Sequence, residues 1–190
     1  MKSIKLLALC LLASGALNAA QAASLSLSPS AQNVTLGNSL SFDVLFNPEG
    51  STAALGAFDF NLTYDASLFG FSGSSFGKGL DVFGLGSIQN LTPSSGALNF
   101  FELSLDSAAD LLANQSMTSF KLATLSFTPQ GTGNARFGLT VNALADAAGD
   151  SLVASATGAL VNVTAVPEPS SYAMLLAGLG MLALAKRRRV

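Results

Sequence analysis

Apolar residues alternate with polar ones in several short stretches of the chain. The alternation is clearest at 40–46, 58–64 and 137–141, and it recurs at 98–105 and 120–127. A period of two is typical of a β-strand with one buried and one wet face. It predicts that the following side chains lie in a hydrophobic core: Phe42, Phe58, Phe60, Leu62, Phe127 and Leu139.

Turn-forming residues separate these stretches. Asn, Pro, Ser and Gly cluster at 47–50, 93–96 and 129–133, as turns between strands require. The pattern predicts about nine strands. One short helix is predicted, at Ser107–Asn114, with Asp110 near its start. The expected fold is all-β: a single antiparallel β-sandwich or jelly roll.

The first 22 residues form a different kind of segment. Lys2 and Lys5 precede the apolar run 6–12, and Ala20-Gln21-Ala22 follows. This order predicts a helical secretory signal peptide at 1–22, with cleavage after Ala22. Cys10, the only cysteine of the chain, is expected to be removed with it, which leaves the exported domain without a disulfide.

The last 24 residues carry a second signal. Pro167-Glu168-Pro169 is followed by an apolar run from Tyr172 to Ala185 and by the cations Lys186, Arg187, Arg188 and Arg189. As a helix the run is about 21 Å long, which makes it a short transmembrane helix for a bilayer core that takes about 20 residues. The cations are expected to stay in the cytoplasm, so that the rest of the chain lies outside.

This tail resembles a PEP-CTERM sorting signal. The tripeptide, the short apolar helix and the basic end occur in that order at 167–190. The resemblance implies export in a Gram-negative bacterium, transient anchoring in the inner membrane, and cleavage near the tripeptide by an exosortase. The expected destination is the cell envelope or surface, or the extracellular matrix.

The domain expected between the two signals, residues 23–166, is acidic. It contains three cations (Lys78, Lys121 and Arg136) and ten acidic residues, a net charge of −7. Such a surface argues against nucleic acid and against an anionic membrane as partners. It is compatible with divalent cations, neutral glycans or a protein.

The chain has few of the residues that enzymes use for catalysis. The chain has no histidine, which removes the commonest general base and any Ser-His-Asp triad. Gly73-Ser74-Ser75-Phe76-Gly77 matches Gly-x-Ser-x-Gly only by spacing. Two carboxylate pairs have a spacing to consider for glycoside hydrolysis, Glu102 with Asp106 and Asp59 with Asp65. Surface carboxylates on strands usually serve solubility, so the prediction is no catalytic residue and no enzyme.

A cofactor is likewise not expected, with calcium as the one candidate. Asp146 and Asp150 bracket a loop, and oxygen ligands suit calcium. Their spacing fits no EF-hand, however, and acidic residues are also common turn formers.

A second resemblance covers nearly the whole exported domain. The segments 34–44 and 55–65 look like the opening strands of a cohesin domain, and 122–133 and 146–152 look like its closing strands. The resemblance implies a nine-stranded jelly roll. In cellulosomes that fold binds the dockerin modules of polysaccharide-degrading enzymes on one sheet face.

Two functions follow as hypotheses. The first is a non-catalytic binding or scaffolding module with a protein partner on a sheet face. The second is a carbohydrate-binding module for exopolysaccharide. Tryptophan is absent and Tyr64 is the only tyrosine of the domain, which favours the first hypothesis. An exposed row of Phe rings on one sheet face would favour the second.

Overall fold

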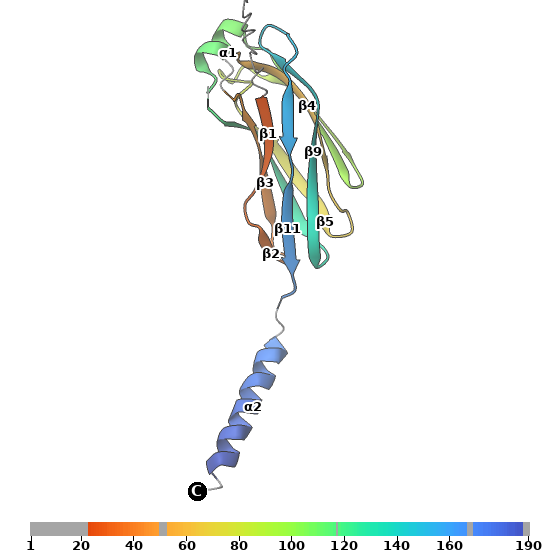
Figure 1. The fold of residues 1–190 in the computed structure, drawn as a ribbon, viewed down its shortest axis with the longest axis vertical. Coiled ribbons are helices and arrows are strands. Elements are labelled where there is room, and N and C mark those ends of the chain that lie inside the picture. The colour runs from red at the N-terminus through yellow and green to blue at the C-terminus, as the bar shows by residue number, and fades with distance from the viewer. Residues whose placement is uncertain (1–22, 50–52, 117, 167–168, 188–190) are drawn as a thin grey trace, which may run out of the picture.

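The computed structural model describes residues 23–49, 53–116, 118–166 and 169–187. The predicted signal helix at 1–22 lies outside these ranges, as do Pro167, Glu168, Arg188 and Arg189 of the tail. Within them the chain forms a two-layered β-sandwich with a short helix at one end, and a second helix follows beyond the opposite end (Figure 1).

One layer, called sheet A, has five strands in the spatial order β10-β1-β3-β8-β5. Their bounds are Ala154–Thr157 (β10), Ala23–Pro29 (β1), Leu40–Asn47 (β3), Phe120–Pro129 (β8) and Phe69–Phe76 (β5).

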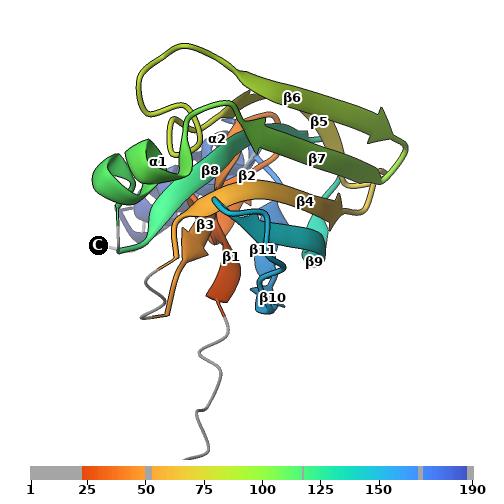
Figure 2. The same cartoon turned by 90° about the horizontal axis from the view of Figure 1, so that it is seen from above.

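The other layer, sheet B, has six strands in the order β2-β11-β9-β4-β7-β6. Their bounds are Asn33–Thr35 (β2), Ala159–Thr164 (β11), Gly133–Asp146 (β9), Leu55–Thr63 (β4), Ala97–Ser104 (β7) and Ser87–Ser94 (β6). Figure 2 shows the two layers from above.

The described ranges contain eleven strands, whereas about nine were expected, because two extended segments change sheets. The first passes from β1 in sheet A to β2 in sheet B, and the last passes from β10 to β11. Gly158 is the single residue between β10 and β11, where the chain passes from sheet A to sheet B. A Cβ there would meet the carbonyl oxygen of Phe137, so only glycine fits.

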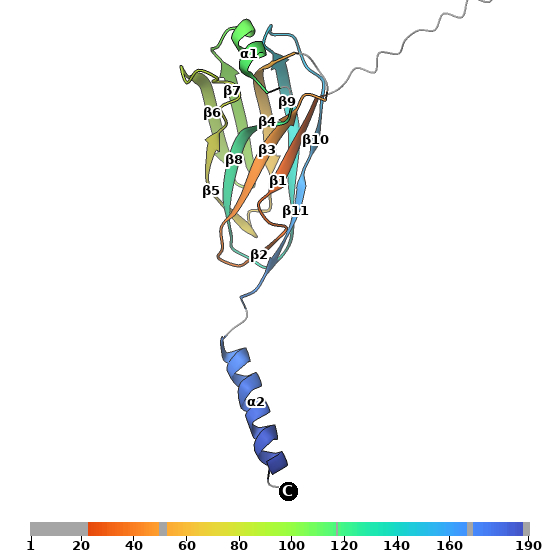
Figure 3. The same ribbon diagram turned by 90° about the vertical axis from the view of Figure 1, so that its left-hand side faces the viewer.

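These crossings also produce two parallel pairings in a sandwich that is otherwise antiparallel. β1 pairs with β10 and β2 pairs with β11, both in parallel. The two ends of the domain therefore run side by side and close one edge of the sandwich. At the other edge, β5 and β6 are the outermost strands (Figure 3).

The core lies between the sheets and is rich in phenylalanine. All six side chains predicted to be buried are buried there. Burial alternates strictly along β3 and along most of β4, which confirms the strand interpretation of the period-two pattern. The Phe60 ring stacks on Phe100, with 5.2 Å between the ring centroids.

The predicted short helix is confirmed as α1, Ala108–Asn114, with Ser107 as its N-cap. The Ser107 hydroxyl accepts a hydrogen bond from the Asp110 N–H and donates one to the Asp110 carboxylate. This reciprocal cap fixes the start of the helix. Leu111 is the residue that α1 buries against the sandwich.

The C-terminal helix is α2, Pro169–Arg187. Across the described ranges, no helix is both long and apolar enough to cross a membrane. Although α2 has 19 residues, its uninterrupted apolar run from Tyr172 to Ala185 has only 14, and a bilayer core takes about 20. The helix is therefore confirmed, and the membrane span predicted with it is not found.

Candidate functional site

The outer face of sheet B carries a connected group of polar side chains. Asp59 and Asn61 come from β4, Asn99 from β7 and Asn142 from β9. All four point outward because the residues next to Asp59, Asn61 and Asn99 on their strands are buried in the core. Residues from three strands, 38 to 83 positions apart in the sequence, thus meet on one surface.

Asp59 is the centre of this group. Its Oδ1 accepts hydrogen bonds from Asn99 Nδ2 at 2.6 Å and from Asn142 Nδ2 at 2.8 Å. Asn61 accepts from Asn99 at 3.0 Å and donates to Asn142 at 3.0 Å. Among the residues that the structure describes, none donates a hydrogen bond to Asp59 Oδ2. The shared bonds hold the four side chains in one arrangement.

An apolar row crosses the same face beside the polar group. Ile88, Leu103, Ala57 and Ala145 occupy neighbouring positions on four adjacent strands. Ile88 is 50% exposed and Leu103 is 38% exposed. On β7, Phe101 lies directly opposite Asp59 of β4, next to this row. The face therefore combines exposed apolar contacts with fixed acceptors and donors, as protein-binding surfaces do.

A hollow of about 230 Å³ lies at the α1 end of this face. Its walls include Ala57, Leu103 and Leu111, and the carboxylates of Asp106 and Asp146 stand at it. Both carboxylates are already used by the backbone. Asp106 Oδ2 accepts the Val82 N–H at 2.8 Å, and Asp146 Oδ1 accepts the N–H groups of Ala148 and Asp150.

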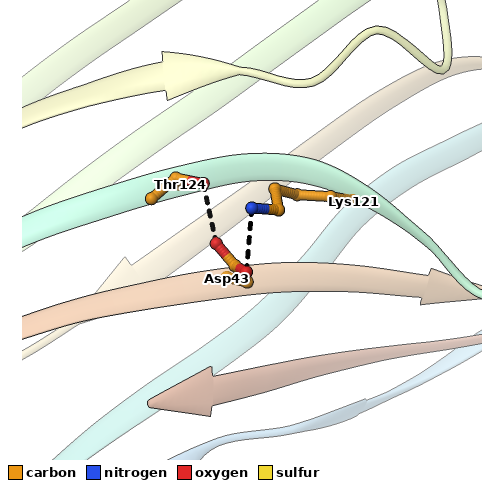
Figure 4. Close-up of polar contacts among 3 residues, drawn as sticks. All are labelled: Asp43, Lys121 and Thr124. Carbon is orange, nitrogen blue, oxygen red and sulfur yellow. Dashed lines mark hydrogen bonds and ion pairs between the residues drawn. The ribbon is translucent and has the colours of Figure 1, made fainter. Parts of the chain in front are cut away.

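The outer face of sheet A is different, because it consists mainly of small hydroxyl side chains from β1, β3 and β8. Its charged feature is the ion pair between Lys121 Nζ and Asp43 Oδ2 at 2.9 Å. Thr124 donates to Asp43 Oδ1 at 2.7 Å (Figure 4). Partial burial opposes ionisation of Asp43, but these partners outweigh it and lower the pKa of the carboxyl. An exposed pair of this kind contributes about 0–1 kcal/mol to stability.

The structure separates the first candidate catalytic pair. Glu102 points into the sandwich and is 1% exposed. Its Oε1 accepts from the Ser87 hydroxyl at 2.6 Å and from Gln89 Nε2 at 2.9 Å. Asp106 follows the end of β7 and lines the hollow at the α1 end of sheet B. Glu102 is not among the residues that line this hollow, so the two carboxylates do not share a site.

The second pair is separated as well. Asp59 belongs to the polar group on sheet B. Asp65 instead shapes the turn after β4, where its Oδ1 accepts from the N–H and the hydroxyl of Ser67. These bonds lower the pKa of the Asp65 carboxyl. The Gly-x-Ser-x-Gly match places Ser74 within strand β5, whereas a nucleophile elbow is a turn between a strand and a helix.

The calcium candidates Asp146 and Asp150 lie in one turn. Asp146 accepts the Asp150 N–H through its side chain and donates its own N–H to the Asp150 carbonyl. Asp146 is therefore a turn former. Among the residues that the structure describes, no three acidic side chains converge on a point that could hold a metal ion. Calcium at this turn stays an untested candidate.

Burial is the main cause of a raised pKa for the Glu102 carboxyl, and the charge of Asp81 adds to it. The hydrogen bonds from Ser87 and Gln89 oppose this rise without cancelling it. Because the pKa of Glu102 in the folded protein lies above the ordinary value of 4.5, this side chain favours the fold below about that pH. Its contribution is lost as the pH rises through the folded pKa.

Replacing Glu102 with glutamine is therefore expected to raise the free energy of unfolding at pH 7 by about 1 kcal/mol. Glutamine keeps an acceptor for Ser87 and Gln89 and removes the buried charge. The gain is expected to shrink as the pH falls towards 4.5. Urea unfolding from pH 4 to pH 8, with the exposed Asp150→Asn as control, measures it. A loss of stability at pH 7, or a gain independent of pH, would contradict this account of Glu102.

The described part of the sorting tail is helical. Pro169 begins α2, and Lys186 and Arg187 lie at its end. A family comparison matches residues 165–189 to the PEP-CTERM protein-sorting motif. The chain thus carries this motif, which is a signal for export to the cell envelope or surface. A comparison with curated protein sequences finds no match.

The fold of the domain is that of a cohesin module. A type I cohesin of ScaB from Pseudobacteroides cellulosolvens superposes with a TM-score of 0.61 at 15% identity, covering 77% of this chain and 95% of its own. The cohesin module of a family 33 glycoside hydrolase from Clostridium perfringens gives 0.60 at 11% identity, covering 77% and 99%. A non-cellulosomal cohesin from Archaeoglobus fulgidus gives 0.56 at 10% identity, covering 80% and 97%. At these identities the likeness concerns the fold.

Sequence reasoning found Asp59 only as a catalytic candidate and did not find Asn99, Asn142, Ile88 or Leu103. Alternation alone assigns Asn99 to the wet face of its strand, because Leu98 and Phe100 on either side are apolar. It does not say which strand lies beside it. The site exists because β4 lies between β7 and β9, and that order is a tertiary property.

Proposed function

We propose that this chain is an exported, non-catalytic binding module that holds a protein partner on the outer face of sheet B. The observation that carries the proposal is the apolar row from Ile88 to Ala145 beside the fixed polar group around Asp59. The cohesin fold adds support. Several cohesins of this fold are known in complex with dockerins, among them those of OlpC and OlpA from Clostridium thermocellum.

A non-catalytic role agrees with the use of the acidic side chains. The carboxylates of Glu102, Asp106 and Asp146 are occupied by hydrogen bonds that hold strands and turns together. Glycoside hydrolysis instead requires two carboxyl groups that face each other across a cleft. The open, flat face of a sheet suits a macromolecular surface better than a small substrate.

Exopolysaccharide is the weaker of the two binding hypotheses. Glycan binding on a sheet face favours a row of exposed aromatic rings. All 13 phenylalanines of the chain lie in the described ranges, and Phe83 is the only one of them that is largely exposed, at 54%. It lies in the loop between β5 and β6. On the outer face of sheet B, Phe101 is half-buried.

A charge placed in the apolar row tests the proposed face. Leu103→Glu is expected to weaken binding of the partner at least tenfold, because a carboxylate at the centre of an interface must lose its water. Leu45→Glu is the matched control, since Leu45 lies on the outer face of sheet A opposite Lys121. The partner is first captured from the source organism with residues 23–166 as bait, and calorimetry then compares the purified variants.

Equal loss of binding in the two variants would place the partner elsewhere and refute the choice of face. Turnover of a glycan that disappears on changing Glu102 or Asp59 to its amide would refute the non-catalytic role altogether.

We also propose that the exported chain is held at the inner membrane of a Gram-negative cell by α2 until an exosortase cleaves it. Thinning of the lipid and snorkelling of Lys186 and Arg187 would let a short helix reach both sides. A proline disfavours the helical conformation in the residue before it, which makes such a tripeptide a suitable processing site.

The processed chain is therefore expected to end near Pro167–Pro169 and to lack the terminal cations. Intact-mass spectrometry of the protein recovered from the envelope or the medium measures its end. The same chain isolated from cells without the exosortase is the control, and it should keep its tail. Recovery of chains with intact Lys186–Val190 as the major species in normal cells would contradict processing.

A further inference from the structure

The sandwich has four edge strands, and they differ in how they are protected from pairing with another chain. They are β10 and β5 in sheet A, and β2 and β6 in sheet B. An edge strand has unpaired N–H and C=O groups along one side. Native edges are usually shortened, bulged, charged or interrupted by a proline so that no second strand can add to them.

Three of the four edges show such protection. β2 has 3 residues and β10 has 4, which is too short for a stable ladder. β5 has 8 residues, but its register shifts at a bulge between Phe71 and Gly73. A bulge bends the strand and interrupts the row of outward groups.

β6 is neither short, bulged nor charged, and its one proline, Pro93, is the last residue but one of the strand. It has 8 residues with no charged side chain among them. Its pairing with β7 runs from Ser87 to Ser94 without a register shift, so the strand is regular. In the view from above it forms the rim of sheet B (Figure 2).

Pro93 determines which backbone groups of β6 point outward. A proline fits in an edge strand when its nitrogen faces away from the neighbouring strand. Because direction alternates along a strand, Ser87, Gln89 and Leu91 also direct their N–H and C=O groups away from β7. The edge thus offers three regular positions, and Pro93 ends the row.

We propose that β6 pairs with β6 of a second copy of this chain, antiparallel, with Gln89 facing its counterpart. This register uses the three free positions of each copy and keeps Pro93 outside the ladder. It is symmetric about a two-fold axis, so each contact occurs twice.

The local charge of this edge is compatible with a second copy as the occupant. Two domains of net charge −7 repel each other at long range, so a contact between them must bring no further like charges together. β6 is neutral, and the single charge of β7, on Glu102, is turned inward and 1% exposed. A basic partner would find no counter-charge on either of these two strands to pair with, whereas two copies can meet here without placing like charges side by side.

The pairing joins two six-stranded sheets into one and leaves both outer faces open. Each dimer would then present two copies of the face around Asp59 and Leu103. Two linked sites bind a partner that carries repeated modules more tightly than one does. Dimerisation does not depend on the proposed function, and either can fail without the other.

Cysteine cross-linking tests the register on the exported domain, residues 23–166. This segment contains every residue of the hydrophobic core and no cysteine. Facing residues of an antiparallel ladder have Cα atoms about 5.5 Å apart, within disulfide range. Gln89→Cys is therefore expected to form a disulfide-linked dimer under mild oxidation. Thr92→Cys, on the same strand, is the control, because two such residues would lie about 20 Å apart in this register.

Sedimentation equilibrium tests the association without a cysteine. We expect a reversible dimer with a dissociation constant of about 10–100 μM, as a small edge contact gives. Asn90→Lys, on the outer side of β6 beside the axis, should weaken it at least tenfold. Thr140→Lys adds the same charge on β9 of the same face and should leave it unchanged.

A monomer at about 1 mM, well above the expected dissociation constant, would overturn the proposal. Equal effects of the two lysines, or equal cross-linking of the two cysteines, would overturn it as well. Selective cross-linking at position 89 together with selective weakening by Asn90→Lys would support it.

Discussion

Replacing Phe60 with alanine is expected to lower the free energy of unfolding by about 3–5 kcal/mol. The Phe60 side chain is fully buried. Its ring lies 5.2 Å from that of Phe100 and 5.4 Å from that of Phe58, stacked against both. The truncation leaves a cavity that neighbouring strands, held by their ladders, cannot close. The loss combines the transfer free energy of the ring with the cost of that cavity.

Chemical denaturation of the exported domain, followed by circular dichroism, measures the change. Phe83→Ala is the matched control, because Phe83 is 54% exposed in the loop between β5 and β6, and it should cost less than about 1 kcal/mol. A loss at Phe60 as small as that of the control would place its ring on the surface. It would also reverse the inside and outside of β4.

The second large effect is expected at Gln115, a buried polar side chain just after α1. Its Oε1 accepts the Leu55 N–H at 2.6 Å, and its Nε2 donates to the carbonyl oxygens of Leu55 and Gly79, both at 2.9 Å. The side-chain amide thus hydrogen-bonds both the N–H and the C=O of Leu55, as the backbone of a neighbouring strand would, at the start of β4. It also ties the loop after β5 to that strand.

Gln115→Ala is expected to destabilise the domain by about 2–3 kcal/mol, because it leaves buried backbone groups without partners. Asn114→Ala is the control. Asn114 is the preceding residue, is exposed, and donates only to the Asp110 carbonyl. Thermal unfolding by calorimetry compares the two. If they cost the same, water has replaced the glutamine at these groups and the proposed role of Gln115 is wrong.

Gln115 also shows where sequence reasoning stops. Nothing in the local sequence distinguishes it from a surface residue after a helix. Its partners are Leu55, which is 60 positions away, and Gly79. Its role follows from the position of α1 over the start of β4, and that position depends on the whole sandwich.

The separation of the two candidate carboxylate pairs also depends on the tertiary structure. Spacing in the sequence allowed Glu102 to act with Asp106, and Asp59 with Asp65. Alternation along β7 instead turns Glu102 inward between Phe100 and Phe58, and alternation along β4 turns Asp59 outward. Asp59 then gains its partners from β7 and β9, the two strands beside it.

What the sequence determined by itself is therefore local. The period-two pattern identified β3, β4, β7, β8 and β9 and predicted buried side chains in four of them, because side chains of a strand alternate between its two sides. The helix predicted at Ser107–Asn114 is α1 to within one residue, because a helix start is satisfied locally, here by Ser107 and Asp110, three positions apart. The tail was identified as a sorting signal because its three parts are contiguous in the chain.

Only the tertiary structure decided which strands are neighbours in each sheet. The parallel closure by β10 and β2, the position of β6 at an edge and the meeting of Asp59 with Asn99 and Asn142 all depend on strand order. Strand order is fixed by how the phenylalanine-rich faces pack against one another across the core. Such packing joins residues far apart in the chain, so the pattern of any single segment does not contain it.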